Sequence, residues 1–225
     1  MFQKWSVWKR WAALAVLVGA VLLLAIDGTV LYLAVPSLTA DLNATSSQVL
    51  WVGDIYSLVL AGLLVTMGNL ADRIGRKKLL ILGSFAFGFA SIIAATASSA
   101  EILILARLLL GIAGATIMPS TLSLIRNIFT DPAERTRAIA IWSAASASGV
   151  ALGPLIGGAL LENFWWGSVF LINLPVMVLV IVFGTLLLPE SRNPNPGKFD
   201  IVSSLLSMLT IIPFVYTIKQ ITGGK

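Results

Sequence analysis

The chain contains no cysteine and no histidine, and few of its residues carry a charge. Without cysteine, disulfide bonds and thiol chemistry are excluded, and without histidine so are histidine-dependent metal sites and general-base chemistry. Only 11% of the 225 residues are charged, whereas 58% are hydrophobic. No glycine-rich phosphate-binding loop is present either. We therefore expect that the chain is not an enzyme and has no catalytic residues, no metal site and no cofactor.

Apolar sequence, by contrast, is abundant, and the mean hydropathy is +0.96. A bilayer core about 30 Å thick is crossed by about 20 residues of helix. The sequence therefore predicts an all-α polytopic membrane protein, with a bundle of six spans and a seventh span after it. The predicted spans are roughly Trp11–Val35, Trp51–Asn69, Leu79–Ala97, Ile102–Ile125, Ala138–Leu161, Val169–Leu188 and Ile201–Ile218.

The positive charges, which give a net charge of +5, lie in alternate connections between the spans. This alternation follows the positive-inside rule, so it favours a cytoplasmic N-terminus and argues against a nucleic-acid partner. The other connections carry only the acids Asp41, Glu101 and Glu162. The basic residues are Lys4, Lys9 and Arg10 before the first span, Arg73, Arg76, Lys77 and Lys78 after the second, Arg126, Arg135 and Arg137 after the fourth, and Arg192 and Lys198 after the sixth.

These features divide the chain into four parts. We expect residues 1–10 to form a cytoplasmic N-terminus that tryptophan side chains anchor at the membrane interface. Residues 11–188 are expected to hold six spans, and residues 189–200 to form a cytoplasmic linker. The seventh span and the end of the chain fall in residues 201–225.

Asp27 interrupts the first span. A central carboxylate costs about 3 kcal/mol on the insertion scale, which about a dozen Leu, Ile and Val residues at roughly −0.3 to −0.6 kcal/mol each offset. Two interpretations are open. Asp27 could reach the lipid headgroups from the outer end of the span, or it could face a polar cavity and exchange a proton or a cationic ligand.

Asp54 lies at the start of the second span, and its helix face continues through Ser57, Leu58, Ala61 and Gly62. A mostly small face is expected to point into a helix bundle rather than toward lipid. Two interpretations are open here too. Asp54 could be a second acid in the same cavity, or it could mark a helix start and complement the helix dipole.

Arg107 is the only basic residue inside a predicted span, and its helix face carries Gly111, Gly114 and Ala115. A buried guanidinium without a partner is very unfavourable, so we expect a carboxylate beside it, with Asp27 as the first candidate. The pair could be a fixed link between two helices. It could also be a switch, because burial favours a neutral carboxyl group and a nearby cation favours a charged one.

Two connections carry further patterns. The one after the second span reads GNLADRIGRKK from Gly68 to Lys78, where two glycines permit a tight turn and one acid among four cations predicts a local charge network. Farther along, Asp131-Pro132-Ala-Glu134 has the capping residues of a helix start. It predicts a short cytoplasmic helix before the fifth span.

The fifth span carries glycine at every fourth position, at Gly149, Gly153 and Gly157, and Gly158 follows directly. This spacing places the first three on one helix face, where small residues let two membrane helices pack backbone to backbone. Pro154 cannot donate a backbone hydrogen bond, so it weakens the helix where the packing is closest. The pattern predicts a tightly packed span that can bend, or simply an ordinary packing face.

Together these segments resemble the major facilitator superfamily, in its 14-helix drug:proton antiporter branch of QacA/SmvA-like multidrug efflux proteins. The motif GxLADRxGRKxxL is complete from Gly68 to Leu80, and GxxxGPxxGG, which is typical of antiporters, is complete from Gly149 to Gly158. The sequence DGTVLYLAVP, from Asp27 to Pro36, is similar to the branch's first-helix motif. Arg107 and Gly111 sit as in the fourth-helix motif, with Leu110 in place of a polar residue.

The resemblance implies an alternating-access carrier in a bacterial cytoplasmic membrane. It would export small lipophilic, often cationic compounds, such as quaternary ammonium antiseptics and dyes, in exchange for protons. No cofactor is implied, because the proton gradient drives transport. The resemblance implies that Asp27, Asp54 and Arg107 couple proton and substrate, and that Tyr56 and Trp142 line the substrate cavity, although Trp142 could serve packing alone. It implies a cytoplasmic gate at Gly68, Asp72, Arg73, Gly75, Arg76 and Lys77. It also implies a packed, bending helix face at Gly149, Gly153, Pro154, Gly157 and Gly158.

Such carriers have two six-helix halves, and this branch adds two further spans. The 225 residues supply one half and one further span, so we expect a fragment that needs the C-terminal half or a second chain. Two other functions stay open: a half-size carrier acting as a dimer, and a non-transporting membrane fragment. The substrate is open as well, since a polyamine, lipid or siderophore exporter would share these features.

Overall fold

The computed structural model describes residues 5–193, together with residues 206, 209, 210, 213 and 217. The predicted seventh span therefore lies outside the described residues, apart from those few positions. Between 5 and 193 the chain forms six helical spans, the sixth made of two consecutive helices, which confirms the all-α membrane fold. The helices are α1 (Val7–Leu42), α2 (Ser46–Ile74), α3 (Arg76–Ala95), α4 (Ala100–Ile128), α5 (Pro132–Asn163), α6 (Ser168–Leu171) and α7 (Asn173–Leu187).

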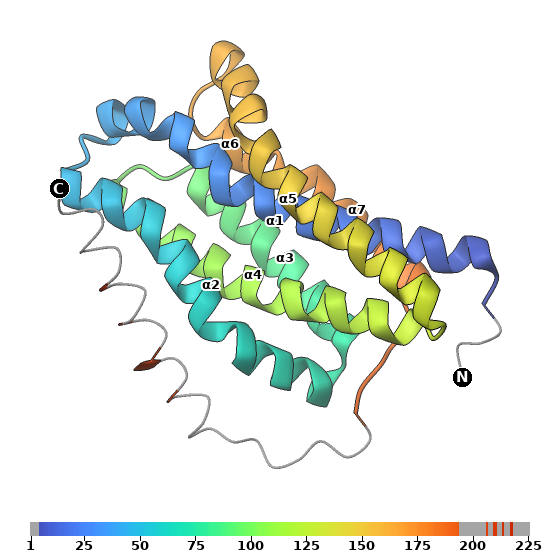
Figure 1. Cartoon of the computed structure of the whole chain (residues 1–225). Helices are drawn as coiled ribbons and strands as arrows, with labels where there is room; N and C mark the ends of the chain where they lie inside the picture. The colour runs from blue at the N-terminus through green and yellow to red at the C-terminus, as the bar shows by residue number, and fades with distance from the viewer. Residues whose placement is uncertain (1–4, 194–205, 207–208, 211–212, 214–216, 218–225) are drawn as a thin grey trace.

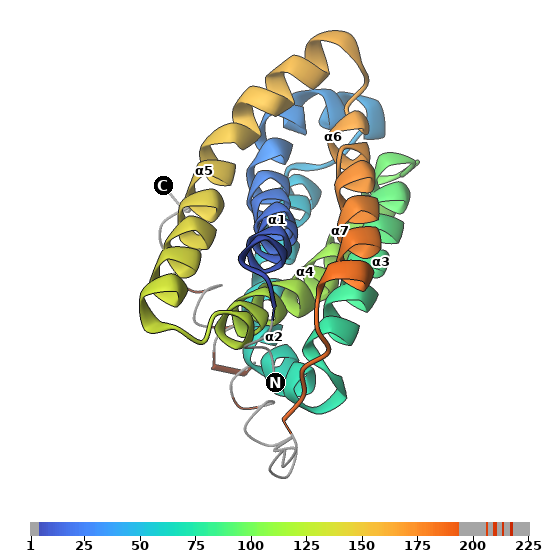
Figure 2. The same cartoon turned by 90° about the vertical axis from the view of Figure 1, so that its right-hand side faces the viewer.

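The helices form a bundle in which α1 and α4 hold the central positions. Helix α1 lies between α5 and α7, as Figure 2 shows, and it also contacts α4. Helix α4 in turn packs against α2 and α3 (Figure 1), and α3 contacts α7. Side chains of α1 and α4 therefore meet near the middle of the bundle, with neighbours on several sides.

The basic connections all come together at one end of the bundle. Arg10, before the first span, forms an ion pair with Glu134 of α5. At the same end Ser191, which follows α7, accepts hydrogen bonds from Arg76 of α3 at 3.1 Å and from Asn127 of α4 at 2.8 Å. The acidic connections meet at the other end, where the Trp166 indole donates to Asp41 at 2.7 Å. The charge asymmetry seen in the sequence is thus an asymmetry between the two ends of the bundle.

Two helices differ from the sequence prediction. Helix α1 has 36 residues, so it continues through Pro36 to Leu42, well past the predicted end at Val35. The apolar window marks the length that can cross the bilayer core, and the residues beyond it stay helical until Asn43 adopts a φ of 49° and ends the helix.

The separate short helix predicted before the fifth span was wrong. Asp131 is an N-cap, and its side chain accepts a hydrogen bond from the Glu134 backbone N–H at 2.9 Å. Pro132 stands at the first helical position, as expected. The helix that begins there runs without interruption to Asn163. The capping signal was therefore correct, but it opens the fifth span itself.

Candidate functional site

Three consecutive residues of α1 point to three different neighbouring helices. Successive residues of an α-helix are about 100° apart around its axis, since a turn holds 3.6 residues. Asp27 contacts Arg107 of α4, Gly28 faces the Tyr56 ring of α2, and Thr29 donates to the Val150 carbonyl of α5. The short segment from 27 to 29 is therefore the point where α1 joins the rest of the bundle.

Asp27 and Arg107 form the buried ion pair that the sequence predicted. Arg107 Nη1 lies 2.9 Å from Asp27 Oδ2, and the two side chains are 1% and 0% exposed. Arg107 Nε also donates to the backbone oxygen of Val52 on α2 at 3.2 Å. Asp27 does not reach the headgroups in this structure, because its carboxylate is enclosed by the bundle. The pair links α1, α2 and α4 at the centre of the molecule.

Tyr56 covers the ion pair on the α2 side. The Arg107 guanidinium carbon lies 4.3 Å from the centre of the Tyr56 ring, which is within cation–π distance. The Tyr56 hydroxyl lies 3.4 Å from the backbone oxygen of Leu24, one turn before Asp27. Gly111 and Gly114 of α4 permit this approach, since a side chain at Gly111 would meet the Tyr56 backbone oxygen at 2.8 Å. The small face of α4 thus holds Arg107 close to α2.

The sequence reasoning missed a third polar partner of Asp27. Asn173 opens α7, is fully buried, and donates from Nδ2 to Asp27 Oδ1 at 2.8 Å. The same Nδ2 lies 3.0 Å from Ser91 Oγ on α3. The signal was available, because Asn173 is the only amide in the apolar run Val169–Leu188. A polar residue inside a membrane span is by default a candidate for a functional role.

Asp54 does not mark a helix start. Helix α2 begins at Ser46, where Thr45 and Gln48 form a capping box. Asp54 lies in the third turn, and its side chain is half-buried. The residues that follow Asp54 on the same helix face differ in burial, because Ser57 is exposed whereas Leu58 and Gly62 are buried. The acid is thus placed within the span, at the margin of the buried surface.

A pocket of about 230 Å³ lies beside the ion pair. It is lined mainly by apolar side chains, with hydroxyl groups from Thr29, Tyr56 and Ser146. Tyr56 is shared between this pocket and the ion pair. Trp142 is not part of the lining, and its indole nitrogen donates instead to Thr121 of α4 at 3.1 Å. The lining residues are Val21, Leu24, Ala25, Gly28, Thr29, Tyr56, Leu60, Met118, Ser146 and Val150.

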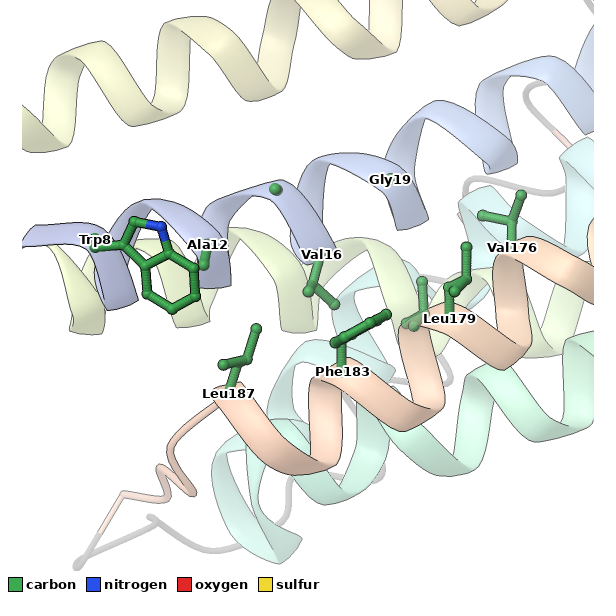
Figure 3. Close-up of a pocket in the computed structure, with 10 residues that line it drawn as sticks. Trp8, Ala12, Val16, Gly19, Val176, Leu179, Phe183 and Leu187 are labelled. Atoms are coloured by element: carbon green, nitrogen blue, oxygen red, sulfur yellow. The ribbon is translucent and has the colours of Figure 1, made fainter.

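A larger pocket of about 390 Å³ lies between α1 and α7 (Figure 3). Its lining runs from Trp8 near the start of α1 to Gly19, and from Val176 to Leu187 on α7. Every lining side chain is apolar apart from the Trp8 indole nitrogen, so this pocket offers no charged partner to a cationic ligand. The charged and hydroxyl groups near α1, at Asp27, Arg107 and Tyr56, lie outside this pocket.

The glycine face of α5 packs directly against α1. Added side chains at Gly149 and Gly157 would meet the backbone oxygens of Leu22 at 2.7 Å and of Val30 at 3.1 Å. A side chain at Gly153 would collide with Thr29. Gly158 differs, since a side chain there would make an ordinary contact with Leu33 at 3.8 Å. The predicted close packing is therefore present, and its partner is the helix that carries Asp27.

Pro154 leaves a carbonyl group that α1 satisfies. In a regular helix the N–H of residue 154 would donate to the oxygen of Val150, but proline has no N–H. The Thr29 hydroxyl lies 3.2 Å from that oxygen. It lies 3.3 Å from two carbonyl oxygens of its own helix as well. Those two already accept backbone hydrogen bonds in α1, so the Val150 oxygen has the greatest need of a donor.

The basic connection after α2 is a corner between α2 and α3, here called the α2–α3 corner (residues 72–78). Asp72 Oδ1 accepts from Arg76 at 2.9 and 2.7 Å, across the helix break at Gly75. Gly75 has a φ of 113°, which favours glycine. Lys77 reaches the backbone oxygen of Thr185 on α7 at 2.7 Å. Of the other motif residues, Gly68 faces Pro119 of α4, and Arg73 is half-buried in the last turn of α2.

The segment that follows α7 closes the α2–α3 corner. The Glu190 carboxylate occupies the space where Gly75 lacks a side chain, and it accepts from the Lys78 backbone N–H at 3.2 Å. It therefore caps the first turn of α3, where Gly75 offers no side chain of its own. Ser191 and Asn193 add backbone hydrogen bonds to Arg76 and Asp72 at 2.8 Å each. This contact could not be predicted from the sequence, because it joins segments more than 100 residues apart.

Comparison with known proteins places the chain among membrane transporters. The sequence profile of the Major Facilitator Superfamily matches residues 17–218. The "multidrug efflux pump LfrA" of Mycolicibacterium smegmatis is 54% identical over 211 residues, which are 94% of this chain and 42% of LfrA.

Two further relatives are similar over nearly the same region. The "methyl viologen resistance protein SmvA" of Salmonella typhimurium is 41% identical over 216 residues, covering 96% of this chain and 44% of SmvA. A "probable actinorhodin transporter" of Streptomyces coelicolor is 41% identical over 212 residues, covering 92% of this chain and 36% of that protein. The chain thus spans somewhat less than half the length of these relatives.

Proposed function

The chain belongs to the major facilitator superfamily, and on that premise we propose that it is the N-terminal half of a bacterial drug:proton antiporter. The carrier exports small lipophilic cations, such as quaternary ammonium antiseptics and dyes, by alternating access. The family is one of transporters rather than enzymes, and the chain is a multi-pass membrane protein. The observation that carries the proposal is the Asp27–Arg107 pair, which is buried beside a pocket that Tyr56 lines.

The pair has the chemistry that an exchange of proton and cation requires. A carboxylate held by one cation can be released to a proton or to another cation, but it satisfies one positive charge at a time. In the structure Asp27 is sealed, so exchange needs a movement of the helices that separates it from Arg107. Binding of a drug cation and binding of a proton then compete, which couples the two flows.

The pocket beside the pair suits part of an aromatic or lipophilic cation. Its volume of about 230 Å³ is smaller than the roughly 300–1,000 Å³ of drug-sized sites, so a second wall is needed. The name of one relative refers to methyl viologen, a bis-quaternary ammonium compound. A cation of that kind would find the Tyr56 ring on one side and the Asp27 charge behind it. Trp142 and Asp54 are proposed as outer contacts of the same path.

The second wall is expected from a C-terminal half. Helices α2 and α5 are the least buried of the six described spans, with 22% and 11% of their apolar windows buried, and they expose large side chains such as Leu50 and Leu155. The relatives are more than twice as long as the region they share with this chain. We therefore place the missing half, or less economically a second copy of this chain, against α2 and α5. Chemical crosslinking from Leu155→Cys would distinguish a partner within one polypeptide from a second copy.

The α2–α3 corner is proposed as a cytoplasmic gate. It ties α2, α3, α4 and the segment after α7 together, through Asp72, Arg76 and Ser191. A set of bonds at one end of the bundle stabilises the conformation in which that end is closed. The glycine face and Pro154 of α5 then form the packed surface on which α1 and α5 move relative to each other.

The experiment that tests the proposal compares two aspartates of α1. Asp27→Asn should abolish drug-dependent proton movement in everted membrane vesicles that contain the full-length protein. Asp41→Asn is the matched control, since it makes the same change on the same helix where the carboxylate binds Trp166. Drug-dependent proton movement by Asp27→Asn equal to that of the wild type would contradict the proposal. The absence of drug export by the wild type would favour a non-transporting fragment.

Orientation can be tested separately, because the 225 residues contain no cysteine. The exposed residues Ser98 and Thr130 lie at opposite ends of α4. A membrane-impermeant maleimide added to intact cells should label Ser98→Cys and leave Thr130→Cys unlabelled. The reverse pattern would place the N-terminus outside the cell.

A further inference from the structure

Asn173 is fully buried, yet it is only partly satisfied. Its Nδ2 donates to Asp27 at 2.8 Å and lies 3.0 Å from Ser91 Oγ, so the amide nitrogen is used twice. Its Oδ1, by contrast, has no hydrogen-bond partner among the described residues. A buried carbonyl oxygen without a donor is unfavourable, and such exceptions call for a reason.

The charge of Asp27 explains which way the amide points. A carboxylate accepts hydrogen bonds and has none to donate, so Asn173 must offer it the NH₂ group. A protonated carboxyl group reverses this requirement on one oxygen, because its O–H needs an acceptor. The Oδ1 of the same amide is an acceptor without a partner, and a half-turn about the last side-chain bond would bring it to Asp27.

We propose that Asn173 is a positioning residue for proton exchange at Asp27, and that its amide turns over when Asp27 is protonated. With a charged Asp27, Nδ2 donates to the carboxylate as in this structure. With a neutral Asp27, Oδ1 accepts the carboxylic O–H, and the proton thus acquires a fixed partner while Arg107 is released. The inference rests on the proposed function, since it assumes that Asp27 exchanges a proton.

Ser91 is placed to follow the turn. Its hydroxyl donates to the Phe87 backbone oxygen at 2.8 Å and accepts from Asn173. After the amide has turned, Oδ1 stands beside Ser91 in the place of Nδ2, so the hydroxyl rotates its O–H from the Phe87 oxygen toward Oδ1. Ser84 lies two turns before Ser91 on the same face of α3, and its hydroxyl makes the same kind of bond within the helix, to the Leu80 backbone oxygen at 2.8 Å. Within the part of the chain that the structure describes, Ser84 forms no hydrogen bond with Asn173 or Asp27, so Ser84 is a matched control.

Few charged groups compete with this effect. Arg107 of α4 is paired with Asp27, and the Tyr56 ring of α2 lies against Arg107. On α2 the half-buried Asp54 is the other carboxyl group near this level. The packed parts of α5, α6 and α7 carry no charged side chain, and the cations of α3 stand at its first turn. The hydrogen bond from Asn173 is therefore a distinct influence on which form Asp27 adopts.

Infrared difference spectra between acid and alkaline pH test the inference on the full-length protein in lipid nanodiscs. With asparagine side chains labelled by ¹³C, the wild type should show a protonated carboxyl band at acid pH together with a shift of one amide band. Asp27→Asn should remove the part of the carboxyl signal that belongs to Asp27, together with the amide shift. Asn173→Leu should remove the amide shift and move the carboxyl band to higher frequency, because the O–H has lost its acceptor.

The outcomes separate the two proposals. A carboxyl signal of Asp27→Asn identical in frequency and intensity to that of the wild type would show that Asp27 does not take up the proton, and the proposed function itself would fail. Loss of the Asp27 part of the carboxyl signal in Asp27→Asn, with no amide shift in the wild type, would overturn only the role of Asn173. If Asn173→Leu fails to fold, the amide band of the labelled wild type and of Ser91→Ala still tests the role of Asn173. Ser84→Ala should give the same spectrum as the wild type.

Discussion

Among the described residues, the Asp27–Arg107 and Asp72–Arg76 pairs are alike in chemistry and opposite in setting. Asp27 and Arg107 are 0% and 1% exposed, and they lie between helices at the centre of the bundle. Asp72 and Arg76 are 38% and 19% exposed, and they lie four residues apart at one end. Water solvates the second pair and not the first, so the two should respond very differently to the loss of one partner.

The two pairs also suit different functions. The central pair isolates one carboxylate from solvent, so that its charge depends on Arg107 and a few polar neighbours. The pair at the α2–α3 corner is embedded in backbone hydrogen bonds to Ser191 and Asn193, which hold segments together. The first setting suits control of protonation. The second suits the closing and opening of one end of the molecule.

The largest effect is expected from breaking the central pair. Arg107→Leu leaves Asp27 charged and enclosed, which should cost about 3–5 kcal/mol of the free energy of unfolding and abolish export. Thermal unfolding in detergent and vesicle transport measure the two effects. Combining Arg107→Leu with Asp27→Asn should recover much of the stability and none of the proton coupling. If the Arg107→Leu variant were as stable as the wild type, the pair would not contribute to the free energy of unfolding as proposed.

A smaller but substantial effect is expected from the glycine face. Gly153→Ala adds a side chain that collides with Thr29, so α1 and α5 must separate, at a cost of about 1–3 kcal/mol. Gly158→Ala is the control within the same motif, because its side chain would meet Leu33 at 3.8 Å. Unfolding midpoints and export rates should fall for the first variant only. Equal effects of both would mean that the motif acts through helix flexibility and not through contact.

The contact between Thr29 and Val150 should contribute about 1 kcal/mol, in the range measured for hydrogen bonds between membrane helices. Thr29→Val removes the donor, whereas Pro154→Ala supplies a backbone N–H to the same oxygen. Thr29→Val should therefore cost less in the Pro154→Ala background than in the wild type. A double-mutant cycle of unfolding free energies measures the difference, and strict additivity of the two changes would argue against the assignment.

The smallest effect on stability is expected at the α2–α3 corner. Asp72→Asn should change the free energy of unfolding by about 1 kcal/mol or less, since half-exposed ion pairs contribute little. Export should nevertheless fall, because the bonds that hold this end closed are weakened. Parallel measurements of unfolding and transport test this separation. A large loss of stability, or full transport, would mean that the corner does not act as a gate.

The sequence allowed much of this to be predicted, for physical reasons that differ between residues. A carboxylate beside Arg107 was predictable because a buried guanidinium needs an opposite charge, but the sequence left open which acid supplies it, with Asp27 only the first candidate. The glycine face was predictable because a four-residue spacing fixes one helix face, although its partner α1 was not. What could not be predicted depends on contacts between distant segments. Two such contacts are the cap that Glu190 forms on the first turn of α3 and the hydrogen bond from Asn173 to Asp27.

Helix limits were the other source of error. Apolar windows report the buried length of a helix, and capping residues report its ends. Where the two signals disagree, as at Asp131, the cap was the better guide to the start of the span. At Asp54 the window suggested a helix start, whereas the cap at Thr45 placed it about two turns earlier. Reading caps before windows would have given both results.

The central claim is that a proton and a drug cation compete for Asp27. The most direct test is to add a quaternary ammonium compound to the purified full-length protein in weakly buffered solution and to record the pH. The account predicts that the wild type releases protons on drug binding, and that Asp27→Asn binds the drug weakly or not at all and releases none. Undiminished proton release by Asp27→Asn would contradict it and place the exchange at another carboxyl group.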